Sequence, residues 1–224
     1  GKVIDSGLQM MGGYGFIEEY TMARQYRDCR IDRIWEGTNE INRQIITGYM
    51  MKKALMEELP IQGAIREIEQ YMKNGELEAE SEILLAESNV VETSKRLALY
   101  LLNEGICEFG QDLKHQQQIA DILANIFMDI YVAESTVLRA KKMLGNPTSH
   151  PSVEGVAKIF VAEMAQQMVQ LAETALKGIY NGDLSPLMHE NLNAFRSRLY
   201  LPTNTIGLKR EIAAYAYSKK CYPY

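Results

Sequence analysis

The chain has 224 residues, of which 46% are hydrophobic and 24% charged, and its formal net charge at pH 7 is −5. This acidic balance, with charges spread along the chain, argues against a nucleic-acid-binding function, which needs clustered lysine and arginine. The length suffices for one large helical domain, or for a domain together with the end of another.

The cysteines and the membrane and export signals indicate a cellular location, and the first residue bears on the extent of the chain. The three cysteines stand apart, and none lies in a C-x-x-C pair, which fits a reduced intracellular chain. No signal peptide opens the chain, and no apolar run is long enough to span a bilayer. We expect a cytoplasmic location of bacterial type, with a mitochondrial one as the alternative. Because Gly1 runs directly into patterned sequence without an initiator methionine, we expect a part of a longer protein.

Continuous helical periodicity begins at Thr38. Residues 1–37 hold a glycine cluster and an arginine-rich stretch. Apolar residues at helical spacing then predict a helix that begins at Thr38 and ends before Pro60. Thr38 suits the N-cap position, and Glu40 complements the positive end of the helix dipole.

Turn residues divide the rest of the chain into further helices, and Thr205 is the predicted N-cap of the last one. These helices are predicted at 61–74, 82–108, 112–144, 152–180, 186–199 and 205–218. No stretch alternates with period two, so no sheet is predicted. The predicted fold class is all-α, with an antiparallel helical bundle in the C-terminal two thirds.

The glycine cluster is the first candidate binding site. Gly12, Gly13 and Gly15 allow a backbone with positive φ and the close approach of another molecule. The alternative is a tight turn between two helices. The Lys-Ser/Thr pair of a P-loop does not follow, so this is not a nucleotide-binding loop of that kind.

Glu36 is the candidate catalytic residue. It follows Trp35, precedes Gly37 and lies within one turn of a predicted helix start. Burial beside Trp35 would raise its pKa, whereas the helix dipole and free amides would lower it. Such opposed influences suit a general base, which is ionised at rest and then accepts a proton. The alternative is a surface glutamate that complements the helix dipole.

Residues 9–43 resemble the signature of the acyl-CoA dehydrogenase family. The elements of that signature are a glutamine, a Gly-Gly-x-Gly turn, an Arg-Asp pair and an aromatic-Glu-Gly-Thr turn. Here they are Gln9, Gly12-Gly13-Tyr14-Gly15, Arg27-Asp28 and Trp35-Glu36-Gly37-Thr38. We interpret the Arg-Asp pair as a structural ion pair before the last turn rather than as catalytic charges.

The resemblance implies FAD as cofactor and an acyl-CoA thioester as substrate. Gln9, Gly12 and Gly13 would contact the adenosine-diphosphate end of an FAD held by a neighbouring subunit, which implies a homo-oligomer. Thr38 and Glu40 match further FAD-contacting positions, although relatives often carry a neutral side chain at the second one. Trp35 and Gly37 would contact the substrate, with Gly37 letting the acyl group pass close to the backbone.

The implied reaction is that of fatty-acid β-oxidation. Glu36 would remove the proton next to the thioester carbonyl while a hydride leaves the neighbouring carbon for the flavin, which yields a trans-2-enoyl-CoA. The thioester oxygen would be held by the backbone N–H of Glu36 and a flavin ribityl hydroxyl, because the developing enolate needs fixed donors. An electron-transfer flavoprotein is the implied electron acceptor.

The length beyond Pro60 resembles the family members with an extra C-terminal helical domain, the very-long-chain type and its bacterial relatives. We expect residues 1–59 to end the catalytic C-terminal domain and residues 60–224 to form the appended bundle. The acidic stretch 62–87 argues against binding to anionic lipid. We expect these 224 residues to be inactive alone, and a non-catalytic assembly domain is the alternative function. The three histidines lack metal-ligand spacing, so no metal site is predicted.

Overall fold

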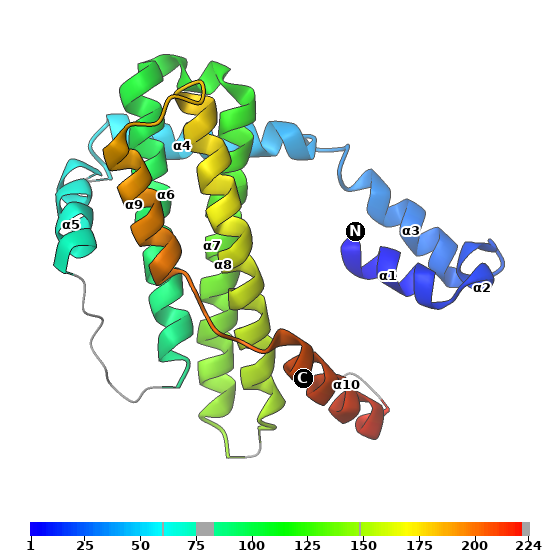
Figure 1. Ribbon diagram of the computed structural model, residues 1–224. Coiled ribbons are helices and arrows are strands. Elements are labelled where there is room, and N and C mark those ends of the chain that lie inside the picture. The colour runs from blue at the N-terminus through cyan, green and yellow to red at the C-terminus, as the bar shows by residue number, and fades with distance from the viewer. Residues whose placement is uncertain (60, 75–82, 148, 221–224) are drawn as a thin grey trace. The chain divides into compact units, whose positions relative to one another are not determined.

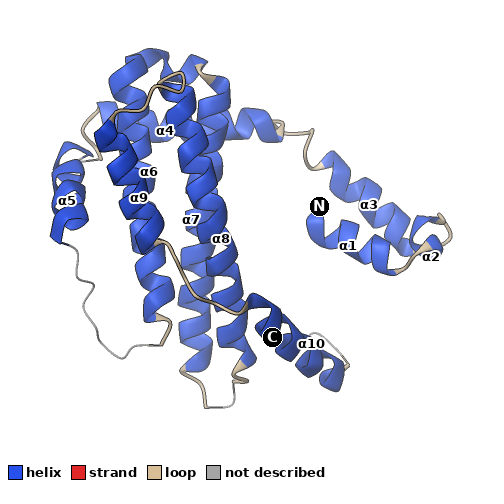
Figure 2. Ribbon diagram, in the orientation of Figure 1, coloured by secondary structure: helices blue, strands red, loops and turns tan. Residues whose placement is uncertain are grey.

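The structure, a computed structural model, describes residues 1–59, 61–74, 83–147 and 149–220. Within these ranges every regular element is a helix, which confirms the predicted all-α class (Figure 2). The chain forms two compact units, Gly1–Ile46 and Thr47–Tyr224. The compact units do not test the predicted domain boundary between residues 59 and 60, which stays a prediction.

The first unit is a small helical hairpin that lacks an apolar core. Helices α1 (Lys2–Met10) and α3 (Thr21–Ile31) pack against each other, with the short α2 (Gly13–Phe16) between them in the chain. Neither α1 nor α3 contains a buried residue. Sequence periodicity assigned no helix to residues 1–37, because these elements have only 9, 4 and 11 residues and the glycine cluster interrupts them.

The second unit is built on three long helices that run side by side in alternating directions, α6 (Leu85–Phe109), α7 (Gln117–Leu144) and α8 (Ser152–Ile179) (Figure 1). Their facing sides bury large apolar residues every three or four positions, which is the spacing that brings side chains onto one helix face. The largest fully buried residues of these helices are Leu97, Leu101, Leu102, Leu123, Ile126, Met168 and Leu176. The predicted antiparallel bundle is therefore confirmed.

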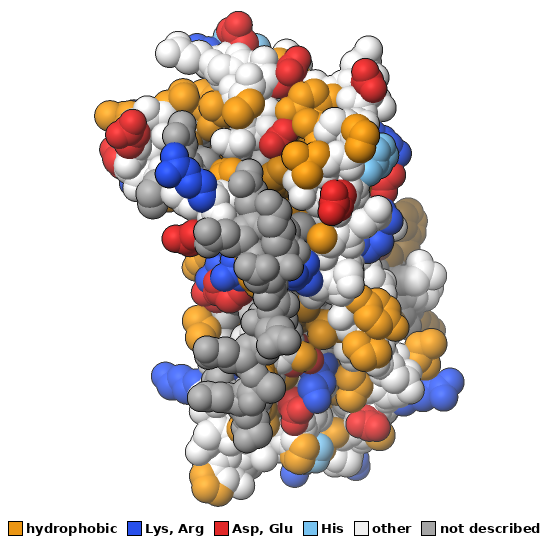
Figure 3. All heavy atoms as spheres, turned by 60° about the vertical axis from the view of Figure 1, so that its left-hand side comes forward, with side chains coloured by type: hydrophobic (Ala, Val, Ile, Leu, Met, Phe, Trp, Pro, Cys, Tyr) orange, Lys and Arg blue, Asp and Glu red, His pale blue; other side chains and the backbone are white. Residues whose placement is uncertain are grey.

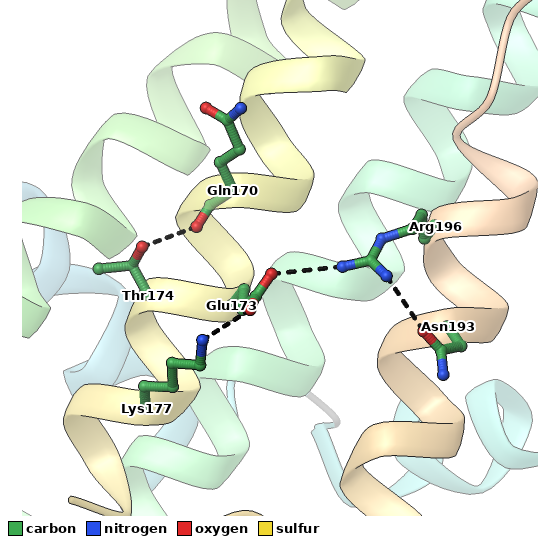
Figure 4. Close-up of polar contacts among 6 residues, drawn as sticks. All are labelled: Gln170, Glu173, Thr174, Lys177, Asn193 and Arg196. Atoms are coloured by element: carbon green, nitrogen blue, oxygen red, sulfur yellow. Dashed lines mark hydrogen bonds and ion pairs between the residues drawn. The ribbon is translucent and has the colours of Figure 1, made fainter. Parts of the chain in front are cut away.

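Shorter helices surround this core. Helices α5 (Ile61–Asn74) and α9 (Pro186–Arg198) pack on α6, and α10 (Thr205–Lys219) lies along α8. Helix α9 is fixed to α8 by the polar cluster of Figure 4, in which Glu173 accepts from Lys177 Nζ at 2.7 Å and from Arg196 Nη2 at 3.3 Å. Lys177 and then Arg196 lower the pKa of Glu173, so the cluster stays charged at neutral pH.

One predicted helix start and one predicted cap are wrong in detail. Instead of one helix from residue 112, a 3-10 helix covers Gly110–His115 and α7 begins at Gln117. The break follows from Gly110, whose φ of 54° ends α6 in a conformation that glycine adopts easily. The last helix is capped by Asn204, which accepts from the backbone N–H of Gly207 at 3.0 Å, and not by Thr205.

Helix α4 (Asn39–Leu55) is unbroken and contributes to both units. Among its residues only Thr47 and Met51 are buried.

On the face drawn in Figure 3, basic and acidic side chains are interspersed, in agreement with the spread of charges along the sequence.

Candidate functional site

The turn between α1 and α2 brings together Gln9, Gly12 and Gly13. Gln9 lies at the end of α1, and its carbonyl oxygen accepts a hydrogen bond from the backbone N–H of Gly12 at 3.1 Å. Gly12 has a φ of 57° and is the N-cap of α2, while Gly13 is the first residue of that helix. All three residues are exposed, so the turn presents backbone to the outside.

The three glycines of this turn have different reasons to be glycine. A side chain at the buried Gly15 would place its Cβ 2.4 Å from the carbonyl oxygen of Leu8, and Gly12 requires the left-handed region. A Cβ at Gly13, in contrast, would meet no atom within 4 Å. The tight-turn interpretation therefore explains Gly12 and Gly15, whereas Gly13 leaves an open space beside the backbone.

Arg27 does not form the expected ion pair with its neighbour Asp28. Its Nη1 atom lies 3.4 Å from Glu18 Oε1, and both side chains are about four-fifths exposed, at 77% and 84%. The pair thus links α3 to the segment that precedes it rather than fixing the turn before Trp35. The difference arises because adjacent residues of a helix point in different directions.

The turn with Glu36 and Gly37 has a strained backbone. Glu36 has a φ of 52° and Gly37 a φ of 89°. For a residue with a Cβ, the left-handed region costs roughly 1–2 kcal/mol, and such residues concentrate at functional sites. Asn42, in the first turns of α4, donates from Nδ2 to the carbonyl oxygen of Gly37 at 2.8 Å and so holds this conformation.

Thr38 is the N-cap of α4, as predicted. Its hydroxyl oxygen accepts from the backbone N–H of Ile41 at 3.3 Å, which satisfies one of the free amides at the helix start. Glu40 follows in the first turn. Its own backbone N–H, then the Thr38 hydroxyl, and more weakly Arg43 and Arg30 lower the pKa of its carboxyl group. Glu40 is therefore an ionised and exposed carboxylate.

Glu36 is not buried beside Trp35, contrary to expectation. Glu36 is exposed, and the Trp35 side chain is 58% exposed. The reason is that the first unit has no apolar core into which the indole could pack. Within the described residues, the backbone N–H of Glu36 donates to no backbone carbonyl, which leaves it open to another acceptor.

Sequence reasoning missed Asn42, the residue that fixes the glutamate turn. Polar residues in the first turns of a helix are common, so its type alone carries little information. The useful signal is its position, five residues after Gly37. From that position of a helix, a side chain can point back towards the N-terminus of the helix.

No metal site emerges among the described histidines, cysteines and carboxylates, since no three of them cluster. His150 instead makes structural contacts at the start of α8. Its Nδ1 atom accepts from the backbone N–H of Ser152 at 3.1 Å at the start of α8, and its ring stacks on Tyr215 with 3.5 Å between the ring centres.

Comparisons with known proteins decide the family. Two family models, both described as the acyl-CoA dehydrogenase C-terminal domain, match residues 2–51 and 93–193. A probable acyl-CoA dehydrogenase of Bacillus subtilis (strain 168) is 35% identical over 224 residues, which cover 98% of this chain and 37% of that protein. The chain belongs to the acyl-CoA dehydrogenase family.

A solved structure from the acyl-CoA dehydrogenase family supports the same conclusion. The crystal structure of an acyl-CoA dehydrogenase complexed with FAD from Bacillus anthracis matches with a TM-score of 0.85 and 30% sequence identity, over 96% of this chain and 36% of that one. The CarC subunit of a caffeyl-CoA reductase-Etf complex from Acetobacterium woodii is 42% identical over 52 residues, 23% of this chain and 14% of that protein.

As a member of the acyl-CoA dehydrogenase family, the chain corresponds to its C-terminal domains, and it spans a little over a third of the first relative, 37%. The first matched stretch, 2–51, contains both candidate turns, and the second, 93–193, contains most of the bundle.

Among the described residues, no helix combines the length and the apolar character needed to cross a bilayer.

Proposed function

We propose that this chain is part of an FAD-dependent acyl-CoA dehydrogenase that oxidises acyl-CoA thioesters to trans-2-enoyl-CoA, as in fatty-acid β-oxidation. The observation that carries the proposal is the strained glutamate turn, in which Glu36 has a φ of 52° directly before the capped start of α4. Residues in this conformation concentrate at functional sites, and Glu36 lies in the stretch 2–51 that matches the family model, unlike the equally strained Glu57.

In this proposal Glu36 is the base that removes the α-proton of the thioester. Its exposed carboxylate is held on a backbone that Asn42 fixes through Gly37, so the base is presented in one orientation. The backbone N–H of Glu36 donates to the thioester oxygen, where negative charge develops as the proton leaves. One residue thus supplies both the base and a donor for the enolate.

Gly37 and Trp35 form the substrate-binding part of the same turn. Gly37 has a φ of 89°, and a Cβ at this position would lie 2.8 Å from Asn42 Oδ1, so only glycine fits the turn and its backbone is the part that would contact the acyl group. Trp35 offers a large exposed indole ring, 58% accessible, to the apolar acyl chain. Binding of the substrate would cover this ring and exclude water from the base.

The α1–α2 turn fits the diphosphate end of FAD. The open space at Gly13 permits close approach to the backbone, and Gln9 adds an amide donor at the same turn. Thr38 and Glu40 are the further cofactor-contacting residues. Because the Glu40 carboxylate is held ionised, it suits a hydroxyl or N–H group of the cofactor rather than a phosphate. FAD, when bound, supplies the hydride acceptor.

The partners and the domain organisation follow from the same proposal. The Gln9 turn serves the cofactor of a neighbouring subunit, so the enzyme is a homo-oligomer. An electron-transfer flavoprotein is the electron acceptor, which the Etf complex named for the CarC relative supports. Residues 1–59 end the catalytic domain and residues 60–224 form the appended bundle. Alone, the 224 residues are inactive, because the other parts of the acyl pocket lie elsewhere in the parent.

A Glu36→Gln variant of the full-length parent tests this role. We expect it to bind FAD but to lose exchange of the substrate α-proton with D2O and to lose turnover, by at least a hundredfold for a general base. Glu57→Gln is the matched control, since Glu57 is also exposed and has a φ of 58°. Near-normal turnover in Glu36→Gln would favour the alternative function, a non-catalytic helical assembly domain.

A further inference from the structure

The loop that carries Glu36 is closed at its base, whereas its tip lacks backbone pairing. The backbone N–H of Asn39 donates to the carbonyl oxygen of Arg33 at 3.2 Å, which joins the two ends of the loop 33–39. At the tip, Glu36 and Gly37 make no hydrogen bond to another backbone group of the part of the chain that the structure describes. Both residues have positive φ, and such a backbone persists only where its surroundings hold it in place.

The side chain of Asn42 supplies the contact that holds the tip. Its Nδ2 atom donates to the carbonyl oxygen of Gly37 at 2.8 Å. Its Oδ1 atom lies 2.8 Å from the place where a Cβ on Gly37 would be, so the amide also lies against the glycine. The backbone N–H of Asn42 donates to the carbonyl oxygen of Thr38 at 2.9 Å, which anchors this amide on the start of α4. All of these residues belong to the unit Gly1–Ile46.

We infer that Asn42 is a positioning residue, which aligns the carboxylate and the backbone N–H of Glu36 on one substrate molecule. Both groups leave the same tip of the loop, so a rotation of the tip would turn both of them at once. This inference rests on the proposed function, which gives Glu36 these two roles, and it adds the residue on which both roles depend.

The reaction makes this alignment valuable. The α-proton leaves as negative charge develops on the thioester oxygen, so the base and the donor must be in place together. A misplacement of a catalytic group by about 1 Å lowers the rate by up to about a hundredfold. A single hydrogen bond that fixes the tip therefore affects both groups.

A role of Asn42 in the helix alone makes the opposite prediction for one substitution. Aspartate has nearly the same shape as asparagine, and a negative charge in the first turns of a helix is favourable to the helix dipole. If Asn42 serves only α4, Asn42→Asp should leave the enzyme intact. If Asn42 holds the tip, the new carboxylate faces the Gly37 carbonyl oxygen without a proton to donate, and the tip moves away.

The test compares three variants of the full-length, FAD-loaded parent. Asn42→Asp replaces the donor by an acceptor, and Asn42→Leu removes the amide at similar size. Asn39→Asp is the matched control, since it adds the same charge at the same helix end. The hydrogen bond of Asn39 to Arg33 uses the backbone N–H, so this variant keeps it. Two readouts are taken, the rate constant of flavin reduction at saturating acyl-CoA and the thermal midpoint with FAD bound.

We expect Asn42→Leu to slow flavin reduction about tenfold and Asn42→Asp about a hundredfold, although the aspartate variant should have the higher thermal midpoint of the two. Asn39→Asp should reduce its flavin at the wild-type rate. Rates that follow the thermal midpoints, a wild-type rate in either Asn42 variant, or equal slowing in Asn39→Asp would overturn the positioning role alone. If acyl-CoA does not reduce the wild-type flavin, the proposed function fails, and this inference fails with it.

Discussion

Arg198 donates a hydrogen bond from Nη2 to the backbone carbonyl oxygen of Tyr71 at 2.8 Å, and its guanidinium carbon lies 4.7 Å from the centre of the Tyr71 ring. The guanidinium carbon of Arg96 lies 4.3 Å from the same ring centre. The Tyr71 hydroxyl is 3.0 Å from the hydroxyl of the buried Thr93. Tyr71 therefore joins α5 to both α6 and α9.

Removing the arginine side chain should loosen α5. Arg198→Ala loses a charge-assisted hydrogen bond and a cation–π contact, so we expect the free energy of unfolding in urea to fall by about 1–3 kcal/mol. Arg196→Ala on the same helix loses only exposed interactions, the pair with Glu173 and the 3.2 Å hydrogen bond that Nη1 donates to Asn193 Oδ1, and should cost less than about 1 kcal/mol. Equal effects of the two substitutions would contradict the role of Tyr71.

Two tyrosines should make the bundle sensitive to alkali. Burial, and then the nearby Glu104, raises the pKa of Tyr100 from 10.0 to about 12. Burial and the 2.6 Å hydrogen bond that Tyr180 donates to Glu104 likewise raise the pKa of Tyr180. The pKa values are higher in the folded state, so the stabilisation by both neutral phenols is complete below pH 10 and is lost as the pH rises through the folded-state values.

This pH dependence can be measured by the absorbance of tyrosinate and by urea unfolding between pH 9 and 12. We expect the wild type to lose stability above pH 10 more steeply than Tyr100→Phe, which lacks the group that titrates. Tyr131→Phe is the control, since Tyr131 is 72% exposed. Identical pH profiles of wild type and Tyr100→Phe would show that the buried phenol does not control alkaline unfolding.

Substitutions of two glycines in the α1–α2 turn should distinguish an effect on folding from an effect on cofactor binding. Gly13→Ala meets no atom of the chain, so we expect a change in stability within about 0.5 kcal/mol together with a lower FAD content of the purified parent. Gly15→Ala drives a Cβ against the Leu8 carbonyl oxygen and should destabilise by about 1–3 kcal/mol. Full FAD content in Gly13→Ala would remove this turn from the cofactor site.

The strained backbone at Glu36 should lower the stability of the wild type, although the Glu36 side chain is needed for turnover. Glycine adopts a φ of 52° without the steric cost of a Cβ, so Glu36→Gly should raise the stability of the parent by about 1 kcal/mol while abolishing turnover. Thermal unfolding with FAD bound measures the first effect. A less stable Glu36→Gly variant would mean that the side chain, rather than the backbone, determines the stability of the turn.

The bundle could be predicted because its helices are amphipathic and end at strong turn residues. Asn181-Gly182 shows this well, since both residues have positive φ and follow Tyr180, the C-cap of α8. The first unit could not be predicted in the same way. Helices α1 and α3 span only 9 and 11 residues and bury no side chain, so each offers too few apolar positions to establish a helical period.

The candidate site was predicted in its residue types and only partly in its geometry. Thr38 was recognised as the cap of α4 because capping depends on local sequence. The exposure of Glu36 depends on tertiary structure, since it follows from the lack of an apolar core in the first unit. The spacing of single residues contains no signal for such an environment.

The most direct test of the central claim is the absorbance spectrum of the full-length parent before and after anaerobic addition of a saturated acyl-CoA. We predict a yellow protein whose flavin band bleaches in the wild type and persists in Glu36→Gln. A colourless protein that FAD cannot reconstitute, or a flavin that acyl-CoA leaves oxidised in the wild type, would contradict the account.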